Sequence, residues 1–427
     1  MKERPRADLV VAYAAQLVTV AGFSDRPKRG DELSQLGVIP DGAVAISGGR
    51  IVAVGPTEAV LREVKVDSGT RVIDASGRLV LPGLVDPHTH LIFAGSREYE
   101  LAMKLAGASY MEIHAGGGGI LDTVRSTREA SLETLVAAGK KYLDQMLKQG
   151  TTTAEAKSGY GLNEPDEIKM LEAIRTLKES QPVTLVATYL GAHAVPEEYR
   201  DNPEGYLCLI TDQVLPRIAG ERLAEFCDVF AEDGVFSIDS ARQILERARR
   251  LGFRLKIHAD EIVSLGGAEL AAEMGAISAE HLMMISERGI QALAASQTVA
   301  VLLPATTFCL MSDRYAPARR MISGNVAISL ASDFNPGSCP VNSLQVVMGI
   351  ACRQMKLRPA EAISAVTINA AHAIGLGGEV GSLEVGKAGD LVIFDAPNCD
   401  YLLYRFGTNL VEQVVKAGRV VVEKSNE

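Results

Sequence analysis

The chain has 427 residues, enough for one domain of barrel size together with a smaller one. Its 53 acidic and 43 basic residues give a net charge of −10 without any basic block, which argues against nucleic acid or an anionic membrane as a partner. The six cysteines are scattered and include no Cys-x-x-Cys pair, so they indicate reduced thiols in the cytoplasm rather than a zinc knuckle or a disulfide framework.

The apolar stretch from Leu9 to Phe23 follows a basic N-terminal segment, as the apolar region of a signal peptide does. Asp8 and Gln16 interrupt this stretch, and strand-forming residues such as Val and Thr dominate it. We therefore expect two β-strands of the mature protein here. No stretch of the chain reaches the roughly 18–20 uninterrupted apolar residues of a membrane-spanning helix, so we expect no membrane partner.

Both ends of the chain are predicted to be rich in short β-strands. Ser47-Gly48-Gly49 separates two strand-like runs and predicts a hairpin, because glycine tolerates positive φ angles. Near the other end, Asp390–Phe394 is typical of a strand, and Lys416-Ala417-Gly418 again separates two strand-like runs. These patterns predict one small β-sandwich domain assembled from residues 1–80 and 381–427.

The middle of the chain, residues 81–380, alternates short apolar runs with helix-like segments. The expected strands are Leu84–His90, Thr151–Glu155, Thr184–Tyr189, Cys227–Ala231, Arg254–His258, Ala276–Glu280, Thr298–Leu303 and Ala327–Ser332. The helix-like segments between them include Ser131–Gln149, Glu164–Ser180, Ser240–Leu251 and Leu265–Met274. Eight such units predict an α/β fold, a (β/α)8 TIM-type barrel, whose chemistry lies at the C-terminal ends of the strands.

The segment Asp86-Pro87-His88-Thr89-His90 closes the apolar run Leu79–Val85, which is typical of a buried strand. Side chains two residues apart on a strand face the same way, so His88 and His90 are expected to point together. Two imidazoles on one strand end can bind a metal ion such as zinc or iron, although both rings could also be merely packed in the core.

Three further candidates stand at the ends of later predicted strands. His258 ends the fifth strand, His281 follows the sixth and Asp333 follows the eighth. The C-terminal ends of barrel strands share one face, so these residues are expected to meet His88 and His90 there. Such a set can hold a catalytic metal and leave a position open for water.

These motifs resemble those of the metal-dependent amidohydrolase superfamily, and within it the imidazolonepropionase family. The superfamily resemblance lies in His88-Thr89-His90 with the residues from Leu81 before it, in His258, His281 and Asp333, and in the tail Gly381–Val392. The family resemblance lies in Phe93–Arg97, Lys157–Leu162, Leu190–Ala194, His258–Glu261 and Ser332–Gly337, so it covers nearly the whole chain.

The resemblance implies a site residue by residue. The implied metal ligands are His88, His90, His258 and Asp333. The implied substrate contacts are Arg97, Tyr160, His193, Glu261, Asn335, Gly337 and Ser338. Proton transfer is expected from His281, Glu261 and Asp333. The family also implies one divalent or trivalent ion per chain, zinc or iron, and a cytoplasmic homodimer.

The implied reaction is the ring opening of 4-imidazolone-5-propanoate to N-formimino-L-glutamate in histidine degradation, through attack of a metal-activated water on the lactam carbonyl. The residue types suit this substrate, because the planar donor fork of Arg97 matches its carboxylate. Glu261 could hold a ring nitrogen or relay its proton. Arg97 could instead form a surface ion pair.

Two alternatives remain open from the sequence. One is another cyclic amidine or amide hydrolase, such as an aminohydrolase acting like guanine or cytosine deaminase. Arg97 argues against it, because a carboxylate clamp has no use for a neutral purine. The other is a metal-free interaction protein on the same barrel, which would be expected to lack the metal ligands that this chain has.

The predicted fourth strand, residues 226–232, contains no Lys. Binuclear relatives of the superfamily place a modified Lys there to bridge two metals, with the His of the sixth strand as a ligand of the second one. Its absence favours a single metal and leaves His281 free for proton transfer.

Other residues receive structural interpretations. Gly116–Gly119 is expected to form a loop over the site, and no phosphate-loop motif follows it. His372 is expected to be a satisfied residue of a helix. Lys256 lies two residues before His258 and is expected to be buried against a carboxylate, either Glu155 or Asp228.

Overall fold

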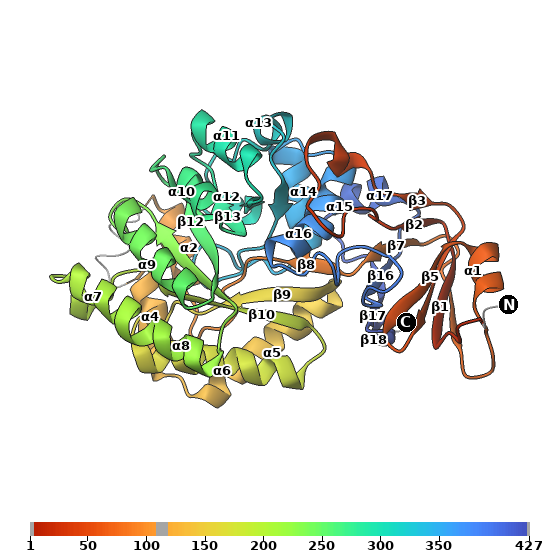
Figure 1. Ribbon diagram of the computed structural model, residues 1–427, viewed down its shortest axis with the longest axis horizontal. Helices are drawn as coiled ribbons and strands as arrows, with labels where there is room; N and C mark the ends of the chain where they lie inside the picture. Colours follow the sequence, from red (N-terminus) through yellow and green to blue (C-terminus); the bar gives the residue numbers. More distant parts are fainter. Residues whose placement is uncertain (1–3, 108–117, 425–427) are drawn as a thin grey trace.

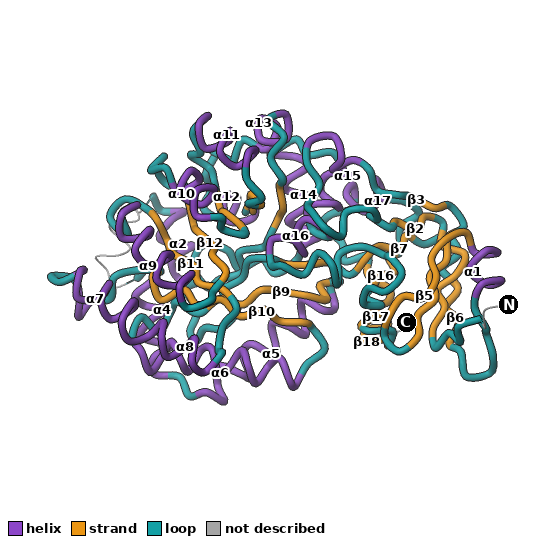
Figure 2. Tube along the Cα trace, in the orientation of Figure 1, coloured by secondary structure: helices purple, strands orange, loops and turns teal. Residues whose placement is uncertain are grey.

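A computed structural model of the chain describes residues 4–107 and 118–424 (Figure 1). Its larger part is a parallel eight-stranded sheet whose strands are neighbours in chain order, from β8 to β15. Helices surround these strands, and a smaller, mostly β part lies beside them and contains both termini (Figure 2). Every described helix is too short or too polar to cross a membrane.

All eight predicted barrel strands are present. They are β8 (Leu84–Asp86), β9 (Thr151–Lys157), β10 (Thr184–Ala192), β11 (Phe226–Ala231), β12 (Arg254–Ala259), β13 (Ser278–His281), β14 (Val299–Leu302) and β15 (Ile328–Leu330). The sheet closes between its first and last members, because Thr89 and Phe334 form a parallel bridge. The predicted (β/α)8 barrel is therefore confirmed.

The helices that cover the barrel begin at residues suited to cap them. For example, Ser131 and Asn163 accept hydrogen bonds from the backbone N–H three residues later, at the starts of α5 and α6. The helices between β8 and β13 are α2 (Tyr99–Leu105), α4 (Ile120–Glu129), α5 (Leu132–Lys148), α6 (Glu164–Ser180), α7 (Pro203–Leu209), α8 (Leu215–Glu221), α9 (Ile238–Arg250) and α10 (Gly267–Met274). Those that follow β13 are α11 (Glu287–Ala295), α12 (Pro304–Cys309), α13 (Ala318–Ser323), α14 (Leu344–Gln354), α15 (Pro359–Ala365) and α16 (Ile368–Ala373).

The smaller part consists of two sheets and the short helices α1 (Thr57–Glu63) and α17 (Cys399–Tyr404). The four-stranded sheet has the order β5 (Arg50–Pro56), β4 (Gly42–Ser47), β1 (Leu9–Ala14) and β6 (Arg71–Asp74). The six-stranded sheet has the order β18 (Arg419–Glu423), β17 (Val411–Lys416), β16 (Leu391–Phe394), β7 (Leu79–Pro82), β2 (Gln16–Val18) and β3 (Val38–Ile39).

These two sheets share one apolar core. Val11 and Val44 from the four-stranded sheet pack in the same cluster as Val80, Ile393 and Val415 from the six-stranded sheet. The predicted small β-sandwich built from both termini is therefore confirmed, as are the strands expected near Leu9. The domain boundaries at residues 80 and 381 stay a prediction.

The apolar run Leu79–Val85 does not form the single strand that its composition predicts. It divides at Gly83, so that β7 joins the small sandwich and β8 begins the barrel. Gly83 donates its N–H to Asp390 O at 3.0 Å, and a Cβ at this position would overlap the side chain of Thr152. Glycine is therefore required where the chain passes from one sheet to the other.

Candidate metal centre and active site

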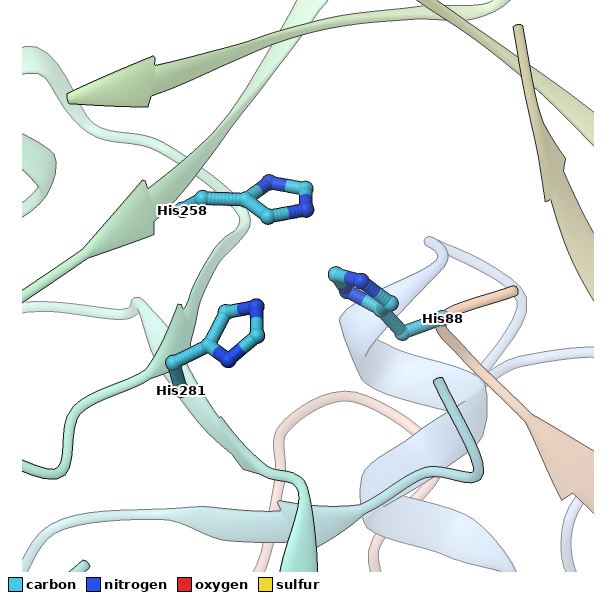
Figure 3. Close-up of side chains that lie close together, drawn as sticks. All are labelled: His88, His258 and His281. Atoms are coloured by element: carbon cyan, nitrogen blue, oxygen red, sulfur yellow. The ribbon is translucent and has the colours of Figure 1, made fainter. Parts of the chain in front are cut away.

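Five predicted site residues converge at the C-terminal ends of the barrel strands. The ligand atoms of His88, His258 and His281 all lie within 4.8 Å of one another, and those of His88, His90 and Asp333 do the same. Figure 3 shows the rings of His88, His258 and His281 pointing into a common space, from the segment after β8, from β12 and from β13. His88 belongs to both groups and is therefore at the centre of the site.

Barrel closure places the two ends of this site together. His88 and His90 lie just beyond β8 rather than in it, which corrects the expectation that they end a strand. Asp333 donates its N–H to His88 O at 3.0 Å, and His90 donates its N–H to Phe334 O at 2.9 Å. These backbone bonds hold the His-x-His segment beside Asp333.

The donor set fits a metal ion. His88 Nε2, His90 Nδ1 and both ring nitrogens of His258 are buried without a hydrogen-bond partner among the described residues, although buried polar atoms are normally paired. The His88 and His90 Nε2 atoms lie 3.4 and 3.3 Å from the same carboxylate oxygen, Asp333 Oδ1. Clustered imidazole nitrogens beside a carboxylate are ligands that zinc and iron accept.

The charge states of these groups are mostly those that metal ligands need, namely neutral imidazole and ionised carboxylate. Burial lowers the pKa of His90 to about 4 and that of His281 well below its usual range. Burial opposes ionisation of Asp333 as well, but its contacts with His88 and His90 hold the pKa of this carboxyl group well below its usual range.

His88 differs from the other rings. Burial and the charge of Lys157 lower its pKa, but Asp333 and Glu280 outweigh them and raise the pKa to about 9. The ring nitrogen Nδ1 of His88 lies 2.8 Å from Glu280 Oε2. Since this carboxylate fixes the proton on Nδ1, the opposite nitrogen is left to face the centre of the site.

Tyr160 and His193 line the site beside His90. The rings of His90 and His193 are stacked, with centroids 4.9 Å apart and an interplanar angle of 14°. The Tyr160 ring lies 5.8 Å from that of His90 and 5.4 Å from that of His193. The loop that carries Tyr160 is held by the buried Glu167, whose Oε1 accepts from the N–H groups of Gly161 and Leu162 at 2.8 and 2.9 Å.

Arg97 makes a two-pronged ion pair with the buried Glu100. Arg97 Nε donates to Glu100 Oε1 at 2.7 Å, and Nη2 donates to Oε2 at 2.9 Å. The remaining nitrogen, Nη1, faces Gly337, where a Cβ would overlap it. Arg97, Gly337 and Ser338 line a cavity of about 710 Å³.

The loop after Asp333 is braced by its own residues. Asn335 Oδ1 accepts from the N–H groups of Gly337 and Ser338 at 2.9 and 2.8 Å, and its Nδ2 donates to Asp333 O at 2.7 Å. The Asn335 amide is thus engaged in shaping the loop, and its contact with substrate stays a prediction.

Glu261 lies against His281. Its Oε1 is 3.5 Å from His281 Nδ1. Burial raises the pKa of Glu261, with Asp333 and Glu232 adding to the effect, to about 8. Near neutral pH, a protonated Glu261 carboxyl group thus lies beside a neutral His281 imidazole.

Comparisons with known proteins place the chain. The model of the amidohydrolase family matches residues 79–421, and a bacterial imidazolonepropionase-like composite domain matches residues 42–63. The imidazolonepropionase of Alkaliphilus oremlandii is 54% identical over 98% of this chain and 99% of its own length. That of Symbiobacterium thermophilum is 53% identical over 98% of both chains. The chain belongs to the amidohydrolase family, in its imidazolonepropionase branch.

Solved structures share the fold of this amidohydrolase at low sequence identity. Guanine deaminase of E. coli superposes with a TM-score of 0.73, at 16% identity, over 97% of this chain and 99% of that chain. An adenosine deaminase from Xanthomonas campestris with bound zinc superposes with a TM-score of 0.72, at 19% identity, over 99% of this chain and 94% of that chain. Membership of the family makes this chain a metal-dependent hydrolase, and the His and Asp cluster provides a site for a divalent ion.

Several buried charges of this amidohydrolase were not assigned a role from the sequence. Glu100 is one, although its position three residues after Arg97 is a spacing that lets helical side chains pair. Lys256 is buried as expected, and it lies 3.3 Å from both Glu155 and Glu280. The expected alternative, Asp228, instead accepts from Lys157 Nζ at 2.8 Å.

The remaining expectations concern residues away from the centre. His372 lies in α16, and its Nε2 donates to Phe23 O at 2.8 Å, so it is a satisfied helix residue as predicted. Gly116 and Gly117, half of the predicted glycine loop, lie outside the described residues.

Proposed function

We propose that this chain hydrolyses the ring of 4-imidazolone-5-propanoate to give N-formimino-L-glutamate, a step in histidine degradation. The observation that carries the proposal is its similarity to imidazolonepropionases over nearly the whole of both chains. The site supports it, because an arginine and a centre of imidazoles lie on the same face of the barrel.

We assign the metal to His88, His90, His258 and Asp333, with one zinc or iron ion per chain. When bound, such an ion polarises a carbonyl group and makes water acidic enough to act as a nucleophile near neutral pH. His281 then remains for the substrate side of the site. Its low pKa leaves the imidazole neutral and able to accept a proton from the attacking water.

Glu261 completes the proton path. With a pKa of about 8 it holds a proton at neutral pH, and it can donate this proton to the ring nitrogen as the carbon–nitrogen bond breaks. The water oxygen forms the new bond to the carbonyl carbon, and His281 holds the proton that the water gave up. The closeness of the two side chains lets the proton return from His281 to Glu261 afterwards.

Arg97 is the proposed contact for the propanoate group. Glu100 balances one positive charge, but Lys104 Nζ also lies 3.5 Å from Glu100 Oε2. Glu98 and Asp313 also line this cavity, so the proposal rests on Arg97 itself, whose Nη1 faces Gly337 in the lining, because a guanidinium group pairs well with a carboxylate. A neutral purine or pyrimidine has no carboxylate that could pair with the Arg97 guanidinium group.

The proposal also covers the oligomeric state of the enzyme, its cellular compartment and its partners. From the family resemblance we propose a cytoplasmic homodimer that has neither nucleic acid nor membrane as a partner, in keeping with the net charge of −10. Sedimentation of the purified protein tests the dimer, and a monomeric mass at micromolar concentration would contradict it.

Turnover tests the function directly. The metal-loaded enzyme should consume 4-imidazolone-5-propanoate, which is followed by loss of the ultraviolet absorbance of its ring, and should release N-formimino-L-glutamate. Guanine and cytosine serve as competing substrates. Release of ammonia from either of them, with no loss of the imidazolone absorbance, would overturn the proposal in favour of a deaminase.

A further inference from the structure

A group of charged side chains lies directly beneath the metal centre, inside the barrel. Two lysines and three carboxylates come from four strands of the barrel, β9, β11, β12 and β13, and each of these side chains is completely buried. They are Glu155, Lys157, Asp228, Lys256 and Glu280. Buried charges are costly unless they are paired and held in good geometry, so this group calls for an explanation.

Glu155 is the centre of this group. Its Oε1 accepts from Lys157 Nζ at 2.7 Å and from Thr188 Oγ1 at 2.6 Å, and lies 3.3 Å from Lys256 Nζ. Its Oε2 accepts from the N–H of Thr89 at 3.4 Å. The carboxylate therefore touches both lysines and the backbone of the His-x-His segment, but none of the histidine rings in the part of the chain that the structure describes.

Each lysine continues to a histidine of the centre. On one side, Lys157 donates to Asp228 Oδ2 at 2.8 Å, and the same oxygen lies 3.1 Å from His258 Nδ1. On the other side, Lys256 lies 3.3 Å from Glu280, which contacts His88 Nδ1 at 2.8 Å.

These contacts act on the orientation of the rings. A carboxylate at Nδ1 of a histidine directs its Nε2 toward a metal, and such outer partners matter nearly as much as the ligands themselves. Glu280 does this for His88. Asp228 lies 3.1 Å from His258 Nδ1 and acts on that ring through its charge, without the geometry of a hydrogen bond, and Thr89 lies between His88 and His90 in the chain. Among the described residues of this network, Glu155 is the one that contacts the backbone of Thr89, the lysine next to Asp228 and the lysine next to Glu280.

We propose that Glu155 is a positioning residue of the metal centre, which sets the rings of His88 and His258 and the turn at Thr89 without contacting the ion. The inference rests on the proposed metal site. A competing explanation is that Glu155 only compensates the charge of the two lysines, in which case any change that keeps the buried charge balanced would leave the metal affinity unchanged.

Metal affinity separates these explanations. Zn²⁺ affinity is measured by competition with a chelator for the full-length parent, for Glu155→Gln and for the double variant Glu155→Gln/Lys256→Met. The double variant loses one charge of each sign and so keeps the net buried charge. Lys256 also contacts Glu280 and donates to Pro87 O at 3.0 Å, beside His88, so Lys256→Met alone is measured as well. We expect Glu155→Gln to bind Zn²⁺ roughly 10–100-fold more weakly than the parent, and the double variant to bind it more weakly than Lys256→Met.

A matched control is Glu361→Gln, which changes a carboxylate that is equally buried but pairs with Arg319 and Arg358 on the helix side of the barrel. It should keep the affinity of the parent. Parental affinity in Glu155→Gln would overturn the proposal, and so would recovery of parental affinity in the double variant, because charge balance alone would then explain the role.

A second readout concerns geometry. Co²⁺ bound in place of Zn²⁺ has a visible spectrum that depends on the arrangement of its ligands, and this spectrum should change in the double variant. If Glu155→Gln does not fold, the double variant, which leaves no added unpaired charge, is compared with Lys256→Met, and equal Zn²⁺ affinity in these two proteins would overturn the proposal. A parent protein that binds no metal would instead refute the proposed function itself.

Discussion

Arg97 and Glu100 form a two-pronged ion pair in which both carboxylate oxygens are bonded to the guanidinium, at 2.7 and 2.9 Å. Glu100 is 1% exposed, so this pair is shielded from water on its inner side. The pair fixes the plane of the guanidinium group before substrate arrives, which reduces the entropy lost on binding.

Arg97→Met should mainly weaken substrate capture. The expected loss of binding free energy, calculated from the ratio of kcat/KM values, is roughly 2–5 kcal/mol, since the variant removes one partner of a shielded charge pair. It should appear in KM more than in kcat, because the carboxylate is remote from the reacting bond. Steady-state kinetics measure it, and Arg97→Lys should be intermediate because it keeps the charge without the fork. Unchanged kinetics in Arg97→Met would mean that the carboxylate is held elsewhere.

Gly337→Ala should disturb the same guanidinium from the other side. A Cβ at residue 337 would overlap Arg97 Nη1, and only the end of that flexible side chain has to move. We therefore expect a folded protein with a raised KM and an unchanged Tm. Gly407→Ala is the control, because its Cβ would meet no atom within 4 Å. If Gly337→Ala leaves KM at the parental value, the position of Nη1 is not important for binding.

His88→Ala should abolish both metal content and activity while the fold is retained. His88 is shared by the two groups of potential ligands, so its loss affects every arrangement of the site. Metal content per chain is measured by elemental analysis and the fold by circular dichroism. His372→Ala, which alters a histidine bonded to Phe23 O far along the chain, should keep its metal. Full metal and full rate in His88→Ala would refute the assignment.

His281→Ala should keep one metal per chain, bind substrate nearly normally and lose turnover by about 10²–10⁴-fold, the usual contribution of a proton-transfer group. The reason is that β11 provides no Lys to bridge a second ion and that His281 faces Glu261. Metal content and single-turnover rates distinguish the roles. Loss of metal from this variant would make His281 a ligand, since its nitrogen also lies within ligand range of His88 and His258.

Lys28 is a completely buried lysine outside the active site, and it should make stability depend on pH. Burial lowers its pKa from 10.5 to about 8, and Glu32 and Glu384 offset this only in part. Between these pH values the unfolded chain binds more protons than the folded one, so the contribution of Lys28 to the free energy of unfolding rises with pH.

Lys28→Met should therefore stabilise the protein most below pH 8, and this gain should shrink by roughly 3 kcal/mol as the pH rises to 10.5. Urea unfolding of the variant and the parent across this range measures the difference. Lys140→Met, which changes an exposed lysine of α5, should show no such trend. A gain that stays constant with pH would contradict the prediction, because it would mean that Lys28 has the same pKa in the folded and the unfolded chain.

The barrel and the clustering of the candidate ligands could be predicted from the sequence because both depend on local patterns. Each strand is a short apolar run, and His258, His281 and Asp333 were located by the rule that barrel chemistry follows strand ends. The division of Leu79–Val85 was missed, because an apolar run looks the same whether it joins one sheet or two. Only the pairing of β7 with β16 distinguishes these cases.

The buried ionic group was predicted only in part. Glu155 and Lys157 alternate on one face of β9, and that local signal was available. Which carboxylate meets which lysine depends on the stagger between neighbouring strands, which a single sequence does not reveal. Asp228 therefore seemed an equal candidate for Lys256, whereas the structure pairs it with Lys157.

The passage of the chain through Gly83 has a consequence for synthesis on the ribosome. β7 pairs with β16, so Leu81 meets Val392 only after the whole barrel sequence has been made. Until then the edge of β7 that later pairs with β16 stays unpaired, and open edges invite association with other chains. The C-terminal strands thus complete the sandwich last, and the newly made chain is most vulnerable to aggregation just before they emerge.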